Sequence, residues 1–220
     1  MILYIVLCLC LAAVFIYEEH KENYVPAVIL KGLASLCFVL LGKSTGNGSR
    51  LSSLILTGLI LGCIADVLLN LRYVFKAKGK LIFLVGILVF LSGHIVYLAA
   101  ILPRNPNPLI CVIAGVIATF FLMKWIFTKI TAEKAFKIFG IFYIGVIVLM
   151  NCVAIANLIA DPCAFTAVYA LGAILFLISD IVLILNTFGS ETKFSLRITN
   201  LSLYYVGQIL IALSLLFLKK

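Results

Sequence analysis

Residues 51–71 read LSSLILTGLILGCIADVLLNL, an apolar run long enough to cross a bilayer that is interrupted by one acid, Asp66. Residues 165–187 read FTAVYALGAILFLISDIVLILNT, a second apolar run that carries Asp180. An ionised carboxylate near the centre of a bilayer costs roughly 2.5–3.5 kcal/mol on insertion scales. Two such residues at matched positions therefore indicate a functional site.

Both runs belong to an internal repeat in which equivalent positions are separated by 114 residues. The matched segments are Ile64-Ala65-Asp66-Val67 with Ile178-Ser179-Asp180-Ile181, Gly58 with Gly172, and Gly93-His94-Ile95-Val96 with Gly207-Gln208-Ile209-Leu210. We predict one transmembrane domain, 1–220, built from pseudo-repeats 1–106 and 107–220. Because four helices per copy is an even number, the two copies enter the membrane in the same direction and are parallel.

Composition places the chain among integral membrane proteins. Hydrophobic residues make up 65% of it and charged residues only 11%, with a mean hydropathy of +1.28, far from the values of soluble domains. The fold class is therefore an all-α polytopic membrane protein with eight transmembrane helices. The predicted spans are Met1–Tyr17, Val25–Gly42, Leu51–Leu71, Leu81–Leu102, Leu109–Ile130, Ile138–Ile159, Phe165–Thr187 and Ile198–Leu218.

The distribution of basic residues predicts the orientation. The loops after the first, third, fifth and seventh predicted helices, with the adjoining helix ends, hold eleven of the 17 Lys and Arg residues. By the positive-inside rule these loops are cytoplasmic and both termini are extracytoplasmic. We expect a multi-pass protein of a bacterial cytoplasmic membrane. The net charge of +9 then faces anionic lipid head groups, and we expect no nucleic-acid partner.

Polar residues inside the predicted spans form the candidate site. Counting 1.5 Å per residue from the basic helix ends places Asp66, Asp180, Lys31, Tyr204 and Tyr205 roughly 10 Å below the basic face. By the same count His94, Gln208 and Asn151 lie near the midplane. A single cavity that opens toward the basic face could hold all of them. The supporting residues are predicted to be Lys31, His94, Tyr97, Asn151, Ser179, Tyr204, Tyr205 and Gln208.

Each of these residues also has a structural interpretation. The aspartates could form interhelical hydrogen bonds or an ion pair with Lys31, and Lys31 could instead extend to the membrane interface. His94 could make an interhelical polar contact, and Tyr204, Tyr205 and Gln208 could serve in packing. The sequence has no second His within a span, so no metal site is predicted, and we expect no cofactor.

Four ordered segments resemble the YhhN family, whose characterised members are lysoplasmalogenases. They are GCIADVLL around Asp66, FLVGILVFLSGHIVY ending at Tyr97, LFLISDIVL around Asp180, and LYYVGQIL around Gln208. Lys31 also matches a lysine in the family's second helix, although Gly32 follows it where the family commonly has proline. The resemblance covers essentially the whole chain.

The resemblance implies hydrolysis of the vinyl ether bond of a lysoplasmalogen to a fatty aldehyde and a glycerophospho-head-group product. A vinyl ether is cleaved by acid, so Asp66 and Asp180 would supply a general acid and a second carboxylate that stabilises the cation. His94 and Tyr205 would position water or the leaving oxygen, and Lys31 would hold the phosphate. The expected partners are the lysophospholipid substrate and membrane lipids, with the oligomeric state left open.

The competing interpretation is a proton- or cation-linked transporter of small molecules or lipids. Paired membrane acids at a repeat interface would serve such a protein equally well. Transporters often have Gly- or Pro-broken helices at matched positions, and this sequence lacks them, which favours the enzyme.

Overall fold

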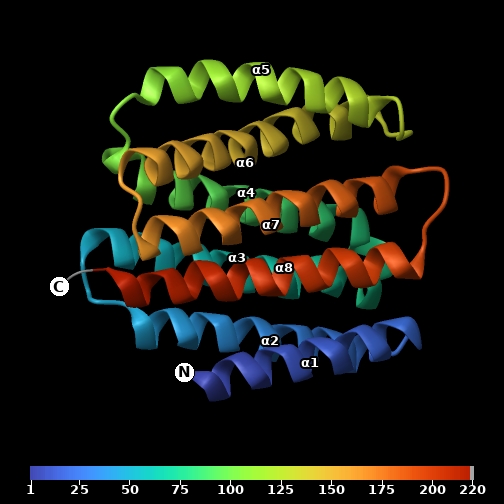
Figure 1. Cartoon of the computed structure of the whole chain (residues 1–220). Helices are drawn as coiled ribbons and strands as arrows, with labels where there is room; N and C mark the ends of the chain where they lie inside the picture. The colour runs from blue at the N-terminus through green and yellow to red at the C-terminus, as the bar shows by residue number, and fades with distance from the viewer. Residues whose placement is uncertain (219–220) are drawn as a thin grey trace. The chain divides into compact units, whose positions relative to one another are not determined.

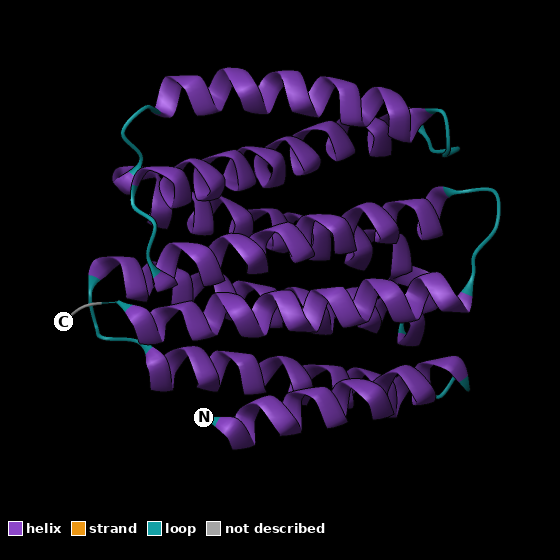
Figure 2. Cartoon of the chain, viewed as in Figure 1, coloured by secondary structure: helices purple, strands orange, loops and turns teal. Residues whose placement is uncertain are grey.

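The computed structural model describes residues 1–218, and these are helical almost throughout (Figure 2). The eight long helices are α1 Ile2–His20, α2 Tyr24–Thr45, α3 Arg50–Val74, α4 Gly79–Ile101, α5 Pro108–Phe127, α6 Lys134–Ala160, α7 Ala164–Phe188 and α8 Phe194–Ser214. All eight are long and apolar enough to cross a membrane, as predicted. Three short 3₁₀ helices, Lys76–Lys78, Leu102–Arg104 and Leu215–Phe217, extend or connect them.

The predicted helix boundaries differ most at the polar ends. Helices α6 and α8 each begin four residues before the predicted start, at Lys134 and Phe194, and α5 ends at Phe127 rather than Ile130. At the starts of α6 and α8, helical hydrogen bonding includes residues before the apolar run, because those flanking residues also form a helix.

Local side-chain chemistry sets several of the helix ends. Ser49 caps α3 by accepting a hydrogen bond from the Ser52 amide at 3.2 Å, and Pro108 occupies the first turn of α5. Cys163 and Thr166 form a capping box at the start of α7. The hydrogen bond from Thr166 also lowers the pKa of the exposed Cys163 thiol.

The chain folds into two compact units. The helices of each can be found by their labels in Figure 1, where colour follows the residue number. Unit 1 is Met1–Ala100 together with the end of the chain from Ile211, and unit 2 is Ile101–Leu210. In unit 1, α2 packs against both α1 and α3, and in unit 2, α6 packs against both α5 and α7. The units differ from the predicted pseudo-repeats 1–106 and 107–220, because the end of the chain from Ile211 joins unit 1, and the parallel repeat stays a prediction.

Matched glycines produce the same close helix crossing in both units. A Cβ atom on Gly93 of α4 would lie 3.4 Å from the carbonyl oxygen of Gly58 on α3. A Cβ atom on Gly207 of α8 would lie 2.9 Å from the carbonyl oxygen of Gly172 on α7. Small residues let helix backbones approach this closely, and both pairs occupy equivalent positions of the repeat. The crossings fix how α4 packs on α3, which carries Asp66, and how α8 packs on α7, which carries Asp180.

We predict that Gly207→Ala destabilises the protein more than Gly145→Ala. The new methyl group at position 207 would meet backbone atoms of Gly172 and Phe176 at 2.9 and 3.2 Å, and backbone atoms cannot rotate away. At position 145 the nearest atom is Thr119 Cγ2 at 3.7 Å, an ordinary contact. Overpacking of this kind costs about 1–3 kcal/mol. Unfolding of both variants in detergent–SDS mixed micelles measures the difference, and equal stability would contradict the crossing.

Candidate functional site: two buried aspartate clusters

Asp66 lies in a buried polar cluster between α2 and α3 that consists of Lys31, Ser35, Asp66 and Asn70. Its Oδ2 accepts a hydrogen bond of 2.6 Å from the Ser35 hydroxyl, and its Oδ1 forms an ion pair of 3.2 Å with Lys31 Nζ. Each of the four residues is at most 4% exposed. The carboxylate is therefore held by a cation and a hydroxyl group within the apolar span.

The predicted alternative that Lys31 extends to the membrane interface is wrong. Lys31 Nζ also donates a hydrogen bond of 3.1 Å to Asn70 Oδ1, and it lies 5.4 Å from the centre of the Phe15 ring of α1. A buried ammonium group needs such partners because desolvation of an isolated charge costs several kcal/mol. Lys31 thus serves Asp66, which leaves its expected role in phosphate binding without structural support.

Asn70 and Glu19, neither of which was predicted as a site residue, extend the polar cluster around Asp66. Asn70 Nδ2 donates a hydrogen bond of 2.9 Å to Glu19 Oε2 at the end of α1. Lys31 with Ser35, and Asp66 with Asn70, are separated by four residues, so each pair lies on one face of its helix. That spacing was the available signal for Asn70. Glu19 could not be predicted, because whether its side chain reaches Asn70 depends on how α1 packs against the neighbouring helices.

Asp180 lies in unit 2, where it is 3% exposed on α7. Its Oδ2 accepts a hydrogen bond of 2.9 Å from the hydroxyl group of Tyr143 on α6. Each aspartate therefore accepts a hydrogen bond from a hydroxyl group on the helix that precedes it in the chain. Tyr143 was not predicted, because a single tyrosine in an apolar helix does not reveal its partner.

Ser179, predicted to support catalysis, joins α7 to α8 through Asn200. Its hydroxyl donates a hydrogen bond of 3.0 Å to the Asn200 carbonyl oxygen. Asn200 Nδ2 donates in return to the Ser179 carbonyl oxygen at 2.9 Å and to the Ser179 hydroxyl at 2.8 Å. Such reciprocal bonds between buried groups fix the rotation of α8 next to Asp180.

The predicted residues of α8 form one buried group with Phe176 of α7. The Tyr204 ring lies 5.3 Å from the Phe176 ring and 5.1 Å from the Tyr205 ring, both in edge-on arrangements. Gln208 Nε2 lies 3.5 Å from the Tyr204 hydroxyl. Tyr204, Tyr205 and Gln208 are thus brought together within unit 2.

His94, Tyr97 and Asn151 occupy other positions. His94 is 1% exposed on α4 and lies between the rings of Phe90, at 5.8 Å, and Tyr97, at 6.4 Å. Tyr97 packs over Gly58, which leaves room for its ring. Asn151 donates a hydrogen bond of 2.9 Å to the Ile147 carbonyl oxygen of its own helix. Within residues 1–218, no three His, Cys, Asp or Glu side chains gather as a metal site requires.

Comparison with known proteins gives one match. Residues 26–215, which include both aspartates and every supporting residue predicted above, match the YhhN family. No curated protein and no solved structure matches the chain.

We predict that Lys31→Met alone destabilises the protein more than Lys31→Met combined with Asp66→Asn. The single change removes the cation from a buried carboxylate and should cost about 3–5 kcal/mol, whereas the double change removes both charges. Arg104→Gln is the control, because the Arg104–Asp161 pair is exposed and should contribute about 1 kcal/mol or less. Equilibrium unfolding in mixed micelles gives the coupling energy, and strictly additive effects would show that the ion pair is not significant.

Proposed function

Because the chain belongs to the YhhN family, we propose that it is a membrane-embedded hydrolase that cleaves the vinyl ether bond of a lysoplasmalogen. Membership of this family suggests a hydrolase. The eight apolar helices can place the protein in the bilayer, where a lipid substrate also resides. The proposal concerns the bond that is cleaved and the residues that cleave it.

The observation that carries the proposal is the pair of aspartates buried within membrane-spanning helices. Asp66 and Asp180 are 2% and 3% exposed, and each accepts a hydrogen bond from a buried or half-buried hydroxyl group. Acidic residues at such depth are costly, and they commonly mark functional sites in membrane proteins.

The chemistry of a vinyl ether requires an acid. Protonation of the β-carbon of the C=C–O group gives an oxocarbenium ion, and water adds to the carbon that is bonded to oxygen. The resulting hemiacetal breaks its C–O bond, which releases a fatty aldehyde and the glycerol hydroxyl group of the head-group product. The added water balances the reaction, and no oxidant or cofactor takes part. A proton donor and a carboxylate that stabilises the cation are sufficient, as in glycoside hydrolysis.

The neighbours of the two aspartates suggest different roles. Asp66 is in an ion pair with Lys31, so we assign to it the carboxylate that stabilises the cation. We assign proton donation to the other aspartate, Asp180, whose carboxyl group contacts the neutral Tyr143 hydroxyl. In this scheme Ser35 and Tyr143 are positioning residues, and His94 and Tyr205 orient water or the leaving oxygen.

The first test is aldehyde release by purified protein in detergent. We expect release from lysoplasmalogen and none from the saturated alkyl-ether analogue, because only the vinyl ether has a carbon that a weak acid can protonate. Asp66→Asn and Asp180→Asn should each lower turnover at least about 100-fold. Asp161→Asn, which alters an exposed acid paired with Arg104, should leave turnover unchanged.

Circular dichroism and gel filtration must show that the inactive variants are folded. Normal turnover in either variant would remove that aspartate from the mechanism. No aldehyde from the folded wild-type protein would overturn the proposed reaction, and proton-dependent uptake into sealed vesicles would then favour the transporter.

The second test follows isotopes into the products. In D₂O the aldehyde should gain one deuterium on the carbon next to its carbonyl group, because that carbon receives the proton in the first step. In H₂¹⁸O the glycerol product should contain no ¹⁸O, since its oxygen comes from the original ether. Mass spectrometry measures both, with authentic aldehyde in D₂O as the control for exchange. An ¹⁸O-labelled glycerol product would show that water attacks the glycerol carbon and would contradict the acid mechanism.

A further inference from the structure

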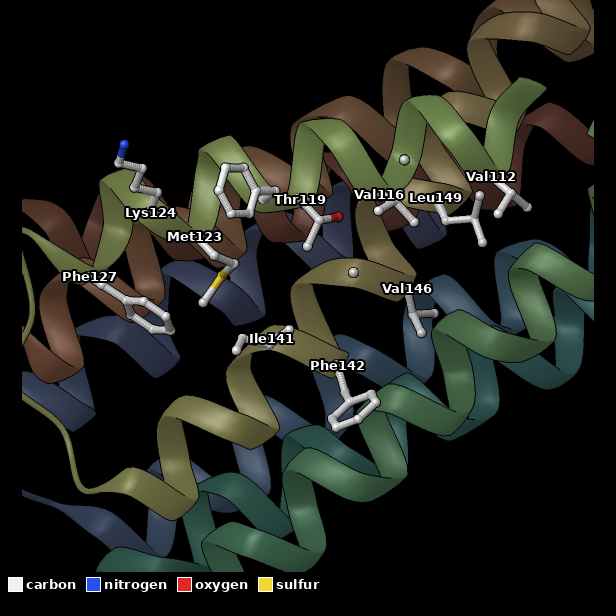
Figure 3. Close-up of a pocket in the computed structure, with 13 residues that line it drawn as sticks. Val112, Val116, Thr119, Met123, Lys124, Phe127, Ile141, Phe142, Val146 and Leu149 are labelled. Carbon is white, nitrogen blue, oxygen red and sulfur yellow. The ribbon is translucent and has the colours of Figure 1, made fainter. Parts of the chain in front are cut away.

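An apolar groove of about 680 Å³ lies between α5 and α6 of unit 2, and none of the residues assigned to hydrolysis lines it (Figure 3). Gly115 of α5 and Gly145 of α6 form part of its lining, and a Cβ on either would lie 3.3 to 3.7 Å from the opposite helix. Val116 and Phe120 from α5 and Phe142 from α6 also line it, and they are 62–64% exposed. The groove is therefore an open apolar channel between two closely packed helices.

The two ends of the groove differ in charge. Lys124 lines one end, and Val112 lies at the other (Figure 3). Lys137 Nζ lies 5.7 Å from the centre of the ring of Phe127, which also lines the groove, so a second ammonium group is close to the same end. Beyond the opposite end, Arg104 and Asp161 compensate each other in an ion pair of 2.9 Å. The groove is thus cationic at one end only.

The cationic end has the features of a membrane interface. Trp125, the only tryptophan of the chain, follows Lys124 and is 46% exposed. Tryptophan gathers at the level of lipid head groups because its ring is apolar and its N–H needs a polar partner. Lys129 follows in the connection to α6 and Lys134 begins α6, with Glu133 as the acid between them. Lys124 should therefore lie at the depth of lipid phosphates.

The length of the groove fits one acyl chain. Val112 and Lys124 are twelve residues apart on α5, which corresponds to about 18 Å along the helix axis. Half of a hydrocarbon core of about 30 Å is about 15 Å, the depth reached by the chains of one leaflet. A molecule with one negative charge at its head and an apolar chain of this length matches the groove in both charge and size.

We propose that the α5–α6 groove is a binding site for an anionic membrane phospholipid, with its phosphate at Lys124 and Lys137 and one acyl chain along the groove. The site is separate from the proposed hydrolysis and needs no vinyl ether. The lipid would fill the open space beside Gly115 and Gly145 and stabilise the packing of α5 on α6. A zwitterionic phospholipid offers the same chain but no net negative charge, so it should bind less tightly.

The test uses quenching of Trp125 fluorescence by brominated lipids in vesicles of phosphatidylcholine and phosphatidylglycerol. The wild-type protein should bind brominated phosphatidylglycerol more tightly than brominated phosphatidylcholine. Lys124→Gln should reduce this preference about fivefold, the contribution of one lysine near the surface. Lys129→Gln removes the same charge from a residue that does not line the groove, and it should change the preference much less.

A second pair of variants tests the groove itself. Val116→Phe fills the groove and should weaken lipid binding, whereas Ile117→Phe changes an adjacent exposed residue outside the groove and should not. Equal binding of the two lipids by the wild-type protein would overturn the proposal, and so would equal effects of Lys124→Gln and Lys129→Gln. If Val116→Phe changes the oligomeric state in light scattering while lipid preference stays the same, a second copy of the chain occupies the groove instead. None of these measurements uses the substrate, so they are independent of the hydrolase assay.

Discussion

Hydrocarbon offers no hydrogen-bond partners, and this constraint accounts for most of the structure. Backbone groups in the spans must pair within helices, which explains why residues 1–218 are almost entirely helical. Polar side chains in the spans must find partners on neighbouring helices. The bonds of Asp66 to Lys31 and Ser35 and of Ser179 to Asn200 meet this requirement, and they also fix how the helices are rotated.

The two aspartates meet this constraint with different partners, although the predicted repeat places them at matched positions. At the repeat offset of 114, Lys31 corresponds to Gly145 and Asn70 corresponds to Ile184. The charged cluster of unit 1 therefore has no counterpart in sequence at those positions of unit 2. In unit 2, the hydroxyl group of Tyr143 on α6 donates a hydrogen bond to Asp180. The contacts described for the two aspartates thus differ, an ion pair with Lys31 for Asp66 and a tyrosine hydroxyl for Asp180, and this difference is the basis for assigning them different roles.

Gly145, which corresponds to Lys31 at the predicted repeat offset, lines the groove between α5 and α6. A glycine removes the side chain from the face of α6 that meets α5, and the space beside it is open and apolar. The same repeat position therefore contributes a buried cation in one unit and part of a lipid-sized groove in the other.

Much of this could be predicted from the sequence. Span length and hydropathy determined the eight helices, because a helix that crosses the hydrocarbon core needs about twenty apolar residues. The same logic identified Asp66 and Asp180, since a charge within such a run is conspicuous. The repeat offset of 114 also matched Gly58 with Gly172 and Gly93 with Gly207, but it did not predict that Gly93 crosses Gly58 and that Gly207 crosses Gly172.

Tertiary structure alone decided the partners of the polar residues. Sequence left Lys31 with either an ion pair or an interfacial position, and packing of α2 on α3 placed it on Asp66. Tyr143, Asn70 and Asn200 were not predicted, because a side chain's partner depends on the rotation and crossing of helices that are distant in sequence. Hydropathy and spacing are properties of single segments, whereas the choice of partner depends on two segments at once.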